Sequence, residues 1–294
     1  MSTVKTVVLP RNLVDPAGRD GWAQWLAATL PEAIQQSQEL WSLTVGEPFQ
    51  PGGQTAWVAP AHDRSGASLV LKVVWPHPEA AHEADGLRAW AGNGAVLLRA
   101  AKDFAGASAL LLERCVPGYP LSDRAEAEQD AVIVGLLQRL WIRPAAAHRF
   151  EPLQAMCELW ATRFEQDAGI DGAGIDPGLV RAGIALFREL PASAADQVLL
   201  CTDLHAGNVL AAEREPWLVI DPKPYVGDRA YDVLQYLLNC DERLAADPRG
   251  LATHMAGLLD LDTERVLLWL FARCVLESPD CPELAAVARR IAPA

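Results

Sequence analysis

The chain has 294 residues, of which 51% are hydrophobic and 21% are charged. At about 150 residues per domain this length predicts roughly two domains, and the apolar content excludes a disordered chain. Lys and Arg number 25 against 38 Asp and Glu, so the net charge is −13, which argues against nucleic acid or an anionic membrane as a partner. The only lysines are Lys5, Lys72, Lys102 and Lys223. Because the chain otherwise uses arginine, each lysine position invites a functional explanation.

The termini and the cysteines indicate a cytoplasmic protein. Residues 1–11 contain no long apolar stretch typical of a secretion signal, and the longest apolar runs, such as residues 266–272, are too short to span a bilayer. The six cysteines lie far apart without a C-x-x-C spacing. This spacing favours reduced, buried thiols over a zinc site or a disulfide framework. The sequence does not determine the oligomeric state.

The first part of the chain, taken as residues 1–116, has the pattern of a small sheet domain. A helical pattern comes first and a second one follows the third strand. Five short segments rich in β-formers or apolar residues are predicted strands. We therefore expect an antiparallel five-stranded sheet with one inserted helix. The predicted helices are 22–40 and 79–92, and the predicted strands are 41–49, 55–61, 68–75, 95–101 and 109–115.

The second part, residues 117–294, is predicted to be larger and mostly helical, so the fold class is α+β. Asp176-Pro177 has the form of a helix N-cap followed by proline at the first helical position. Three short strands are predicted at 198–201, 209–212 and 217–220. Helices are predicted around 133–141, over 151–166, from 177, and over 228–240, 243–258, 262–277 and 282–291.

Three polar residues at strand ends have the composition of a phosphoryl-transfer site. Asp203 and Asn208 lie five residues apart in a loop between two predicted strands, and Asp221 directly follows the next strand. Phosphoryl transfer requires one Asp that orients the acceptor hydroxyl and takes its proton, while an Asn and a second Asp hold Mg²⁺ on a nucleoside triphosphate. Carboxylate and amide oxygens are hard ligands that suit magnesium.

Lys72 adds a candidate phosphate-binding group. It lies within the apolar segment 69–75, and its ammonium can hold phosphates as a point charge, with Glu83 on the following helix positioned to pair with it. The alternative is that Lys72 extends to solvent from an edge strand. Phosphate binding is favoured by the order and the sequence contexts of five residues: Lys72, Glu83, Asp203, Asn208 and Asp221.

With these residues the chain resembles the aminoglycoside phosphotransferase family, which has the protein-kinase-like fold. Within it, the resemblance is greatest to the branch of streptomycin 6-phosphotransferases and hydroxyurea-resistance kinases. The resemblance covers residues 41 to about 240 and is carried by segments 46–58, 71–83, 111–118, 203–210 and 220–232.

The resemblance implies a two-lobe fold with an N-lobe of residues 1–116 and a C-lobe of residues 117–294. It also implies ATP and Mg²⁺ as cofactors. Lys72 would bind the ATP phosphates and be held by Glu83. Asp203 would be the catalytic base, and Asn208 and Asp221 would be the magnesium ligands.

Further residues acquire roles from the same resemblance. Backbone groups of Glu113, Arg114 and Cys115 would form the hinge that recognises adenine. Gly52 and Gly53 would form the loop over the phosphates.

The catalytic loop departs from the family pattern at two places. The family usually has His-Gly before the catalytic Asp, where this chain has Cys201-Thr202. Pro222-Lys223 replaces the Phe-Gly of protein kinases after Asp221, which suits this family better. In the family that His is generally a scaffold residue and not the base, so we expect activity to be retained with a repacked loop. Asp232 would brace the loop as a structural residue. The glycine loop has no G-x-G-x-x-G and is a weak match by itself.

Four polar residues have open roles. His205 could contact substrate or phosphate, or only form hydrogen bonds within its loop. Lys223 could reach a phosphate, although we interpret it as a solvated turn lysine. Asp241 and Glu242 could line an acceptor pocket for a cationic substrate, or they could form an exposed helix end.

Three functional hypotheses follow. The first is an ATP-dependent kinase of a small-molecule hydroxyl, with an aminoglycoside such as streptomycin as acceptor and a role in antibiotic inactivation. The second is a metabolic kinase of the same fold acting on a sugar or amino alcohol. The third is a catalytically silent nucleotide-binding regulator. Sequence alone does not select the acceptor, because the acceptor pocket is built from variable helices and a fold does not fix a function.

Overall fold

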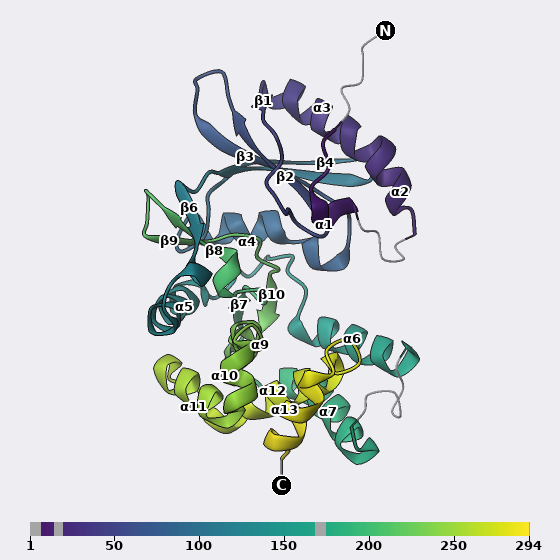
Figure 1. Ribbon diagram of the computed structural model, residues 1–294, viewed down its shortest axis with the longest axis vertical. Helices are drawn as coiled ribbons and strands as arrows, with labels where there is room; N and C mark the ends of the chain where they lie inside the picture. The colour runs from purple at the N-terminus through teal and green to yellow at the C-terminus, as the bar shows by residue number, and fades with distance from the viewer. Residues whose placement is uncertain (1–6, 15–19, 168–174, 294) are drawn as a thin grey trace. The chain divides into compact units, whose positions relative to one another are not determined.

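The computed structural model describes residues 7–14, 20–167 and 175–293 of the chain (Figure 1). The chain folds into two compact units. Unit 1 is formed by Met1–Gly118 and Ala211–Leu218, and unit 2 by Tyr119–Leu210 and Val219–Ala294. Unit 1 therefore includes a short segment that the sequence analysis assigned to the second domain.

Unit 1 contains the predicted sheet. Its five strands are all antiparallel and run in the order β1-β2-β3-β5-β4. The predicted five-stranded sheet with one inserted helix is thus confirmed. In chain order, the elements are α1 (Arg11–Val14), α2 (Trp22–Gln24), the π-helical turn η1 (Trp25–Thr29), α3 (Leu30–Trp41), β1 (Thr44–Val45), β2 (Ala56–His62), β3 (Ser68–Val74), the 3-10 turn η2 (Pro78–Ala80), α4 (Glu83–Trp90), β4 (Leu98–Phe104) and β5 (Ala107–Glu113).

The core of unit 1 lies between the N-terminal helices and the sheet. Leu30 and Ile34 of α3 are buried in the same cluster as Leu71 and Val73 of β3. Trp22 stacks on Trp25 with a ring-centroid distance of 5.2 Å. The apolar face predicted for residues 22–40 therefore covers the sheet, which fixes β3 as a buried central strand.

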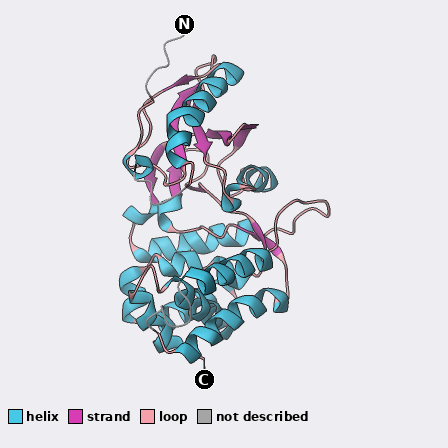
Figure 2. Cartoon of the chain, turned by 90° about the vertical axis from the view of Figure 1, so that its right-hand side faces the viewer, coloured by secondary structure: helices cyan, strands magenta, loops and turns pink. Residues whose placement is uncertain are grey.

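Unit 2 is mostly helical, whereas the long strands belong to unit 1 (Figure 2). The antiparallel strands β7 and β10 of unit 2 form a two-stranded sheet. A three-stranded sheet is formed by β6, β8 and β9, and each of these strands includes residues of unit 1 as well as of unit 2. The elements are β6 (Pro117–Pro120), η3 (Leu121–Asp123), α5 (Glu126–Leu140), α6 (Leu153–Asp167), α7 (Pro177–Glu189), η4 (Leu190–Ser193), β7 (Val198–Leu200), η5 (Ala206–Asn208), β8 (Val209–Ala212), β9 (Trp217–Val219), β10 (Tyr225–Gly227), α8 (Arg229–Asp232), α9 (Leu234–Leu238), α10 (Asp241–Ala246), α11 (Pro248–Leu259), α12 (Thr263–Glu277) and α13 (Glu283–Ile291).

Capping residues explain where several of these helices begin. Asp176 accepts hydrogen bonds from the backbone N–H groups of residues 178 and 179, as its predicted N-cap role requires. The single helix predicted over 243–258 is wrong, because α10 ends at Ala246. Asp247 caps the next helix by accepting from Gly250 N, and Pro248 occupies its first position. The predicted helix over 228–240 is likewise divided into α8 and α9.

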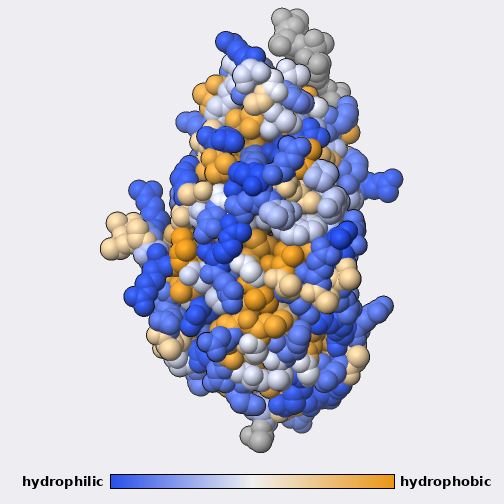
Figure 3. All heavy atoms as spheres, turned by 90° about the vertical axis from the view of Figure 1, so that its left-hand side faces the viewer, coloured by the Kyte–Doolittle hydropathy of each residue, from blue (hydrophilic) through white to orange (hydrophobic). Residues whose placement is uncertain are grey.

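Helix α12 forms the centre of unit 2. Ten of its residues, from Val266 to Leu276, are buried, which is typical of a helix surrounded by protein on all sides. No helix in the described residues has the length and apolar character needed to cross a membrane. Hydrophilic side chains cover much of the molecular face in Figure 3, as the 38 acidic residues lead one to expect.

Candidate active site

Lys72 and Glu83 form a buried ion pair in unit 1. Lys72 lies on β3 opposite Val58 of β2 and Leu110 of β5, so it is on a central strand and the edge-strand alternative is wrong. Its Nζ is 2.7 Å from each carboxylate oxygen of Glu83, the first residue of α4. The two side chains are only 6% and 3% exposed. The expected pairing is thus present, and the helix N-terminus further favours the negative charge of Glu83.

The side chain of Glu113, in the proposed hinge, is fully engaged. Its carboxylate accepts hydrogen bonds from Leu97 N at 2.9 Å and from Arg214 Nε and Nη2 at 2.8 and 2.9 Å. Burial raises the pKa of Glu113, but the bonds from Arg214 and Leu97 N outweigh burial and leave the pKa below its usual value. Arg214 also donates to the carbonyl oxygens of Gly92 and Ala95, which follow α4. Sequence reasoning missed Arg214, whose partner lies 101 residues earlier.

The other predicted nucleotide-binding residues of unit 1 are two glycines in a tight turn, Gly52 and Gly53, and two residues after β5, Arg114 and Cys115. Gly52 has a φ of +83°, and a Cβ atom there would lie 2.3 Å from Pro10 Cβ, so glycine is required at this turn. Its neighbour is Gly53, where a Cβ would lie 3.1 Å from the backbone oxygen of residue 56. Arg114 donates to the hydroxyl of Ser68 at 3.4 Å. Burial raises the pKa of Cys115 to about 12, so its thiol is neutral near pH 7.

Asp232 forms hydrogen bonds with the candidate catalytic loop of unit 2. This carboxylate is fully buried and accepts from the backbone N–H groups of Cys201 and Thr202, at 3.1 and 2.6 Å, and from Trp141 Nε1 at 2.9 Å. Burial nevertheless raises the pKa of Asp232 to about 6. Three N–H donors thus fix the turn that immediately precedes Asp203.

Asn208 and Asp221 are brought together at the end of this loop. Asn208 Nδ2 donates to the carbonyl oxygen of Asp203 at 3.0 Å, and Ile220 N donates to Asn208 O at 2.9 Å. Asp221 follows with a left-handed φ of 53°. Within the described residues, no three His, Cys, Asp or Glu side chains are grouped to hold a metal ion. Mg²⁺ that arrives with a nucleotide needs only one or two protein ligands, because phosphate and water supply the others.

The interpretation of Lys223 as a solvated turn lysine is wrong, because its side chain forms an ion pair with Asp203. Its Nζ lies 3.0 Å from Oδ2 of Asp203, and the side chain is 31% exposed while that of Asp203 is 16% exposed. The sequence signal for this contact was the scarcity of lysine in an arginine-rich chain.

His205 lies within the catalytic loop and also lines a cavity. Its Nδ1 accepts from Gly207 N at 3.2 Å, so the expected hydrogen bond within the loop is present. Burial lowers the pKa of His205 despite the nearby carboxylate of Asp203. The cavity, of about 460 Å³, groups His205 with both Asp241 and Glu242 of α10.

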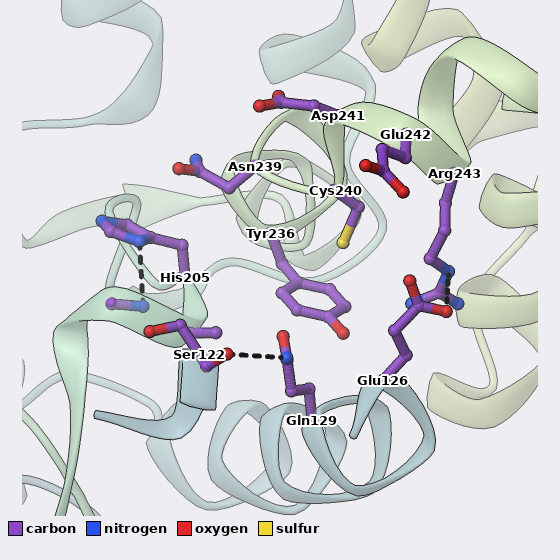
Figure 4. Close-up of a pocket in the computed structure, with 12 residues that line it drawn as sticks. Ser122, Glu126, Gln129, His205, Tyr236, Asn239, Cys240, Asp241, Glu242 and Arg243 are labelled. Carbon is purple, nitrogen blue, oxygen red and sulfur yellow. Dashed lines mark hydrogen bonds and ion pairs between the residues drawn. The ribbon is translucent and has the colours of Figure 1, made fainter. Parts of the chain in front are cut away.

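Figure 4 shows the residues that line this cavity, with Tyr236 of α9 between His205 and Arg243 in the view. Sequence reasoning missed those from α5 and α9, which become neighbours only through helix packing. The whole lining is Ser122, Glu126, Gln129, His205, Ala206, Gly207, Tyr236, Asn239, Cys240, Asp241, Glu242 and Arg243.

A buried carboxylate stabilises one wall of this cavity. Asp130 of α5 is 5% exposed and accepts from Tyr236 Oη and from both terminal nitrogens of Arg243, at 2.9 Å each. His254 Nε2 of α11 lies 3.1 Å from its second oxygen. Burial raises the pKa of Asp130, but the bonds from Arg243 and Tyr236 outweigh it and lower the pKa overall. Asp130 therefore links four helices around the cavity.

Comparison with known proteins identifies the family of the chain. The sequence matches the family described as aminoglycoside/hydroxyurea antibiotic resistance kinase over residues 41–280. It is 36% identical to a hydroxyurea phosphotransferase from Kitasatospora aureofaciens, over 92% of this chain and 78% of that protein. It is 31% identical to a streptomycin 6-kinase from Streptomyces glaucescens, over 93% of this chain and 90% of that protein.

A solved structure supports the fold. The choline kinase from Streptococcus pneumoniae superposes with a TM-score of 0.58 at 12% identity, covering 90% of this chain and 98% of that one. Together with other phosphotransferase structures of this kind, it confirms the predicted protein-kinase-like fold. The predicted kinase activity is also confirmed, since the relatives are kinases and phosphotransferases. The chain therefore belongs to the aminoglycoside/hydroxyurea antibiotic resistance kinase family.

Proposed function

We propose that this kinase transfers the γ-phosphoryl group of ATP to a hydroxyl group of streptomycin or a closely related cationic aminoglycoside. The observation that carries the proposal is the acceptor cavity, whose lining includes the carboxylates of Glu126, Asp241 and Glu242. Arg243 is the only Lys or Arg among the described lining residues, and it is paired with Asp130 at 2.9 Å and with Glu126 at 3.7 Å. A cavity with this charge suits guanidinium groups such as those of streptomycin.

The nucleotide-binding residues that we propose fit ATP and Mg²⁺. Lys72, held by Glu83, would bind phosphate oxygens, since a buried ammonium on a rigid strand is a preorganised point charge. Asn208 and Asp221 would hold Mg²⁺, which would neutralise charge on the phosphates when bound. The backbone of residues 113–115 would bind adenine, and Gly52 and Gly53 would cover the phosphates.

Asp203 would act on the acceptor. Its carboxylate would orient the acceptor hydroxyl and take its proton as the new O–P bond forms. The bonds that Asp232 accepts from the preceding turn support this role, because a base contributes to catalysis only when its position is fixed.

Hydroxyurea is the second candidate acceptor, favoured by the 36% identity to a hydroxyurea phosphotransferase. It is uncharged and much smaller than streptomycin. A cavity of about 460 Å³ lined by three carboxylates would surround it loosely. The size and charge of the cavity therefore favour the aminoglycoside.

A direct comparison of the acceptors tests the proposal. The purified protein is incubated with ATP and Mg²⁺ plus streptomycin, another aminoglycoside or hydroxyurea, and ADP release and the mass of the acceptor are measured. We expect phosphorylated streptomycin, no product in Asp203→Ala, and a KM for streptomycin raised about tenfold or more in Asp241→Asn/Glu242→Gln. Phosphorylation of hydroxyurea but not of streptomycin would contradict the proposed acceptor.

A further inference from the structure

The feature behind this inference is the position of Lys223 next to the proposed base. Its Nζ is 3.0 Å from Asp203 Oδ2. Its backbone is tied to the same turn at two points: Lys223 N donates to Cys201 O at 2.9 Å, and Thr202 Oγ1 donates to Lys223 O at 2.5 Å. The loop after Asp221 is therefore fastened to the residues immediately before Asp203.

Thr202 shows that this arrangement is maintained at a conformational cost. Its φ of 52° lies in the left-handed region, which a β-branched residue rarely adopts. Two hydrogen bonds hold it there, one from its N–H to Asp232 at 2.6 Å and one from its hydroxyl to Lys223. The hydroxyl that distinguishes Thr202 from the glycine usual in the family thus contacts the backbone of Lys223. Such strain is sustained where the surroundings fix a functional geometry.

Charge explains why a cation is needed at this point. Asp203 and Asp221 bring two carboxylates to a site that, in the proposed function, also receives a triphosphate. A carboxylate near a phosphoryl group is repelled by it, and this repulsion is large where water is partly excluded. A cation in contact with the carboxylate removes much of the repulsion. An ammonium on a flexible chain can contact both groups as a compact point charge, which the planar guanidinium of arginine does less readily.

We propose that Lys223 is a catalytic residue whose ammonium group holds the Asp203 carboxylate in place and neutralises negative charge on the phosphoryl group during transfer. The proposal rests on Asp203 being the base of the proposed function. In the step, the acceptor oxygen forms a bond to the γ-phosphorus while the bond from that phosphorus to the β,γ-bridging oxygen breaks. ADP leaves with the electron pair, and the acceptor proton passes to Asp203. Lys223 keeps its protons throughout.

The test compares Lys223→Met with the wild type and with Lys102→Met. Lys102 is an exposed lysine of β4 and serves as the matched control. We expect Lys223→Met to lower kcat by about 10²–10³-fold, the loss typical of a removed electrostatic stabiliser. The Kd of Mg²⁺-ATP, measured by calorimetry, should change by less than about threefold. Lys223→Arg should recover about tenfold in kcat, because it restores the charge with a different geometry.

Several outcomes would overturn the proposal. Unchanged kcat in Lys223→Met would show that the ion pair has no catalytic role. An equal loss of Mg²⁺-ATP affinity would make Lys223 a nucleotide-binding residue instead. If Lys223→Met has an unfolding temperature low enough to account for the lost activity, and Lys223→Arg recovers no activity, the role of Lys223 is structural.

The same variants separate this proposal from the proposed acceptor. If the wild type phosphorylates neither streptomycin nor hydroxyurea but slowly hydrolyses ATP, and Lys223→Met loses that hydrolysis, the acceptor is wrong and the role of Lys223 stands. If streptomycin is phosphorylated equally well by wild type and Lys223→Met, the acceptor stands and the role of Lys223 is wrong. A wild type that consumes no ATP overturns both.

Discussion

The ion pair between Lys72 and Glu83 predicts that stability and activity respond differently to the same substitutions. Both side chains are almost completely buried, and Nζ is 2.7 Å from each carboxylate oxygen. Glu83→Gln keeps the side-chain shape but leaves the Lys72 ammonium buried beside a neutral amide. Breaking a buried pair in this way costs roughly 3–5 kcal/mol, because the remaining charge loses its compensation. For domains of this size the unfolding midpoint should fall by roughly 6–20 °C.

The double variant Lys72→Met/Glu83→Met should recover most of this loss. Replacing both charges with apolar side chains of similar volume is often neutral or stabilising, since neither charge then has to be desolvated. We therefore expect the double variant to lie within about 1 kcal/mol of the wild type in unfolding free energy. It should nevertheless fail to bind Mg²⁺-ATP, because the proposed phosphate-binding ammonium is gone.

Urea unfolding followed by circular dichroism, with calorimetric titration of Mg²⁺-ATP, measures both properties in the three proteins. A double variant as unstable as Glu83→Gln would refute the reasoning, because the loss would then come from packing and not from an uncompensated charge. Tight Mg²⁺-ATP binding by the double variant would refute the role of Lys72.

Three further predictions concern other groups of unit 2. Because burial raises the pKa of Asp232 to about 6, the folded state binds this proton more tightly than the unfolded state. The unfolding free energy of the wild type should therefore fall by about 3 kcal/mol relative to that of Asp232→Asn as the pH rises from about 4 to 7. Urea unfolding at several pH values measures this difference, and parallel pH profiles of the two proteins would contradict it. Asp130→Asn should raise the KM for the acceptor about tenfold and leave the KM for ATP unchanged in steady-state assays, because Tyr236 loses an ionised partner at the cavity wall. Cys240 lines the cavity, so bound acceptor should slow its alkylation, measured by peptide mass spectrometry, while the exposed Cys281 reacts at an unchanged rate; equal protection of both would place the acceptor elsewhere.

The sequence predicted those parts of the site that depend on local pattern. Lys72 was identified because alternating and apolar segments locate a strand, and Glu83 because a helix follows within a few residues. Asp203, Asn208 and Asp221 were recognisable because each lies at the end of a short predicted strand. In all five cases the residue lies close in sequence to the element that positions it.

The missed residues depend on contacts between distant segments. Arg214 and Glu113 are 101 residues apart, and no periodicity connects them. Asp130 reaches Arg243 and His254 across more than 110 residues, through the packing of α5 against other helices. An acidic residue near the apolar positions of a predicted helix was the available signal for Asp130, since a buried carboxylate requires partners.

Backbone conformation explains why the contact between Lys223 and Asp203 was not predicted from the sequence. The loop that brings Lys223 to Asp203 has left-handed φ values at Thr202 and Asp221, and a β-branched residue such as Thr202 rarely adopts them. Propensity therefore gives no reason to bring the two turns together. The hydrogen bonds from Thr202 to Asp232 and to the Lys223 carbonyl stabilise the Thr202 conformation, and those bonds exist only in the folded protein.

The positions of the acidic residues indicate more about which acceptor is bound than the net charge of the chain does. A net charge of −13 is compatible with many small molecules and distinguishes none of them. Exposed carboxylates spread over a surface are screened by salt within about 10 Å. Glu126, Asp241 and Glu242 are also exposed, but they line one cavity beside His205, so their fields add over a short distance. Affinity for a cationic acceptor should therefore depend on these three residues, and neutralising three acidic residues away from the cavity should leave the affinity unchanged.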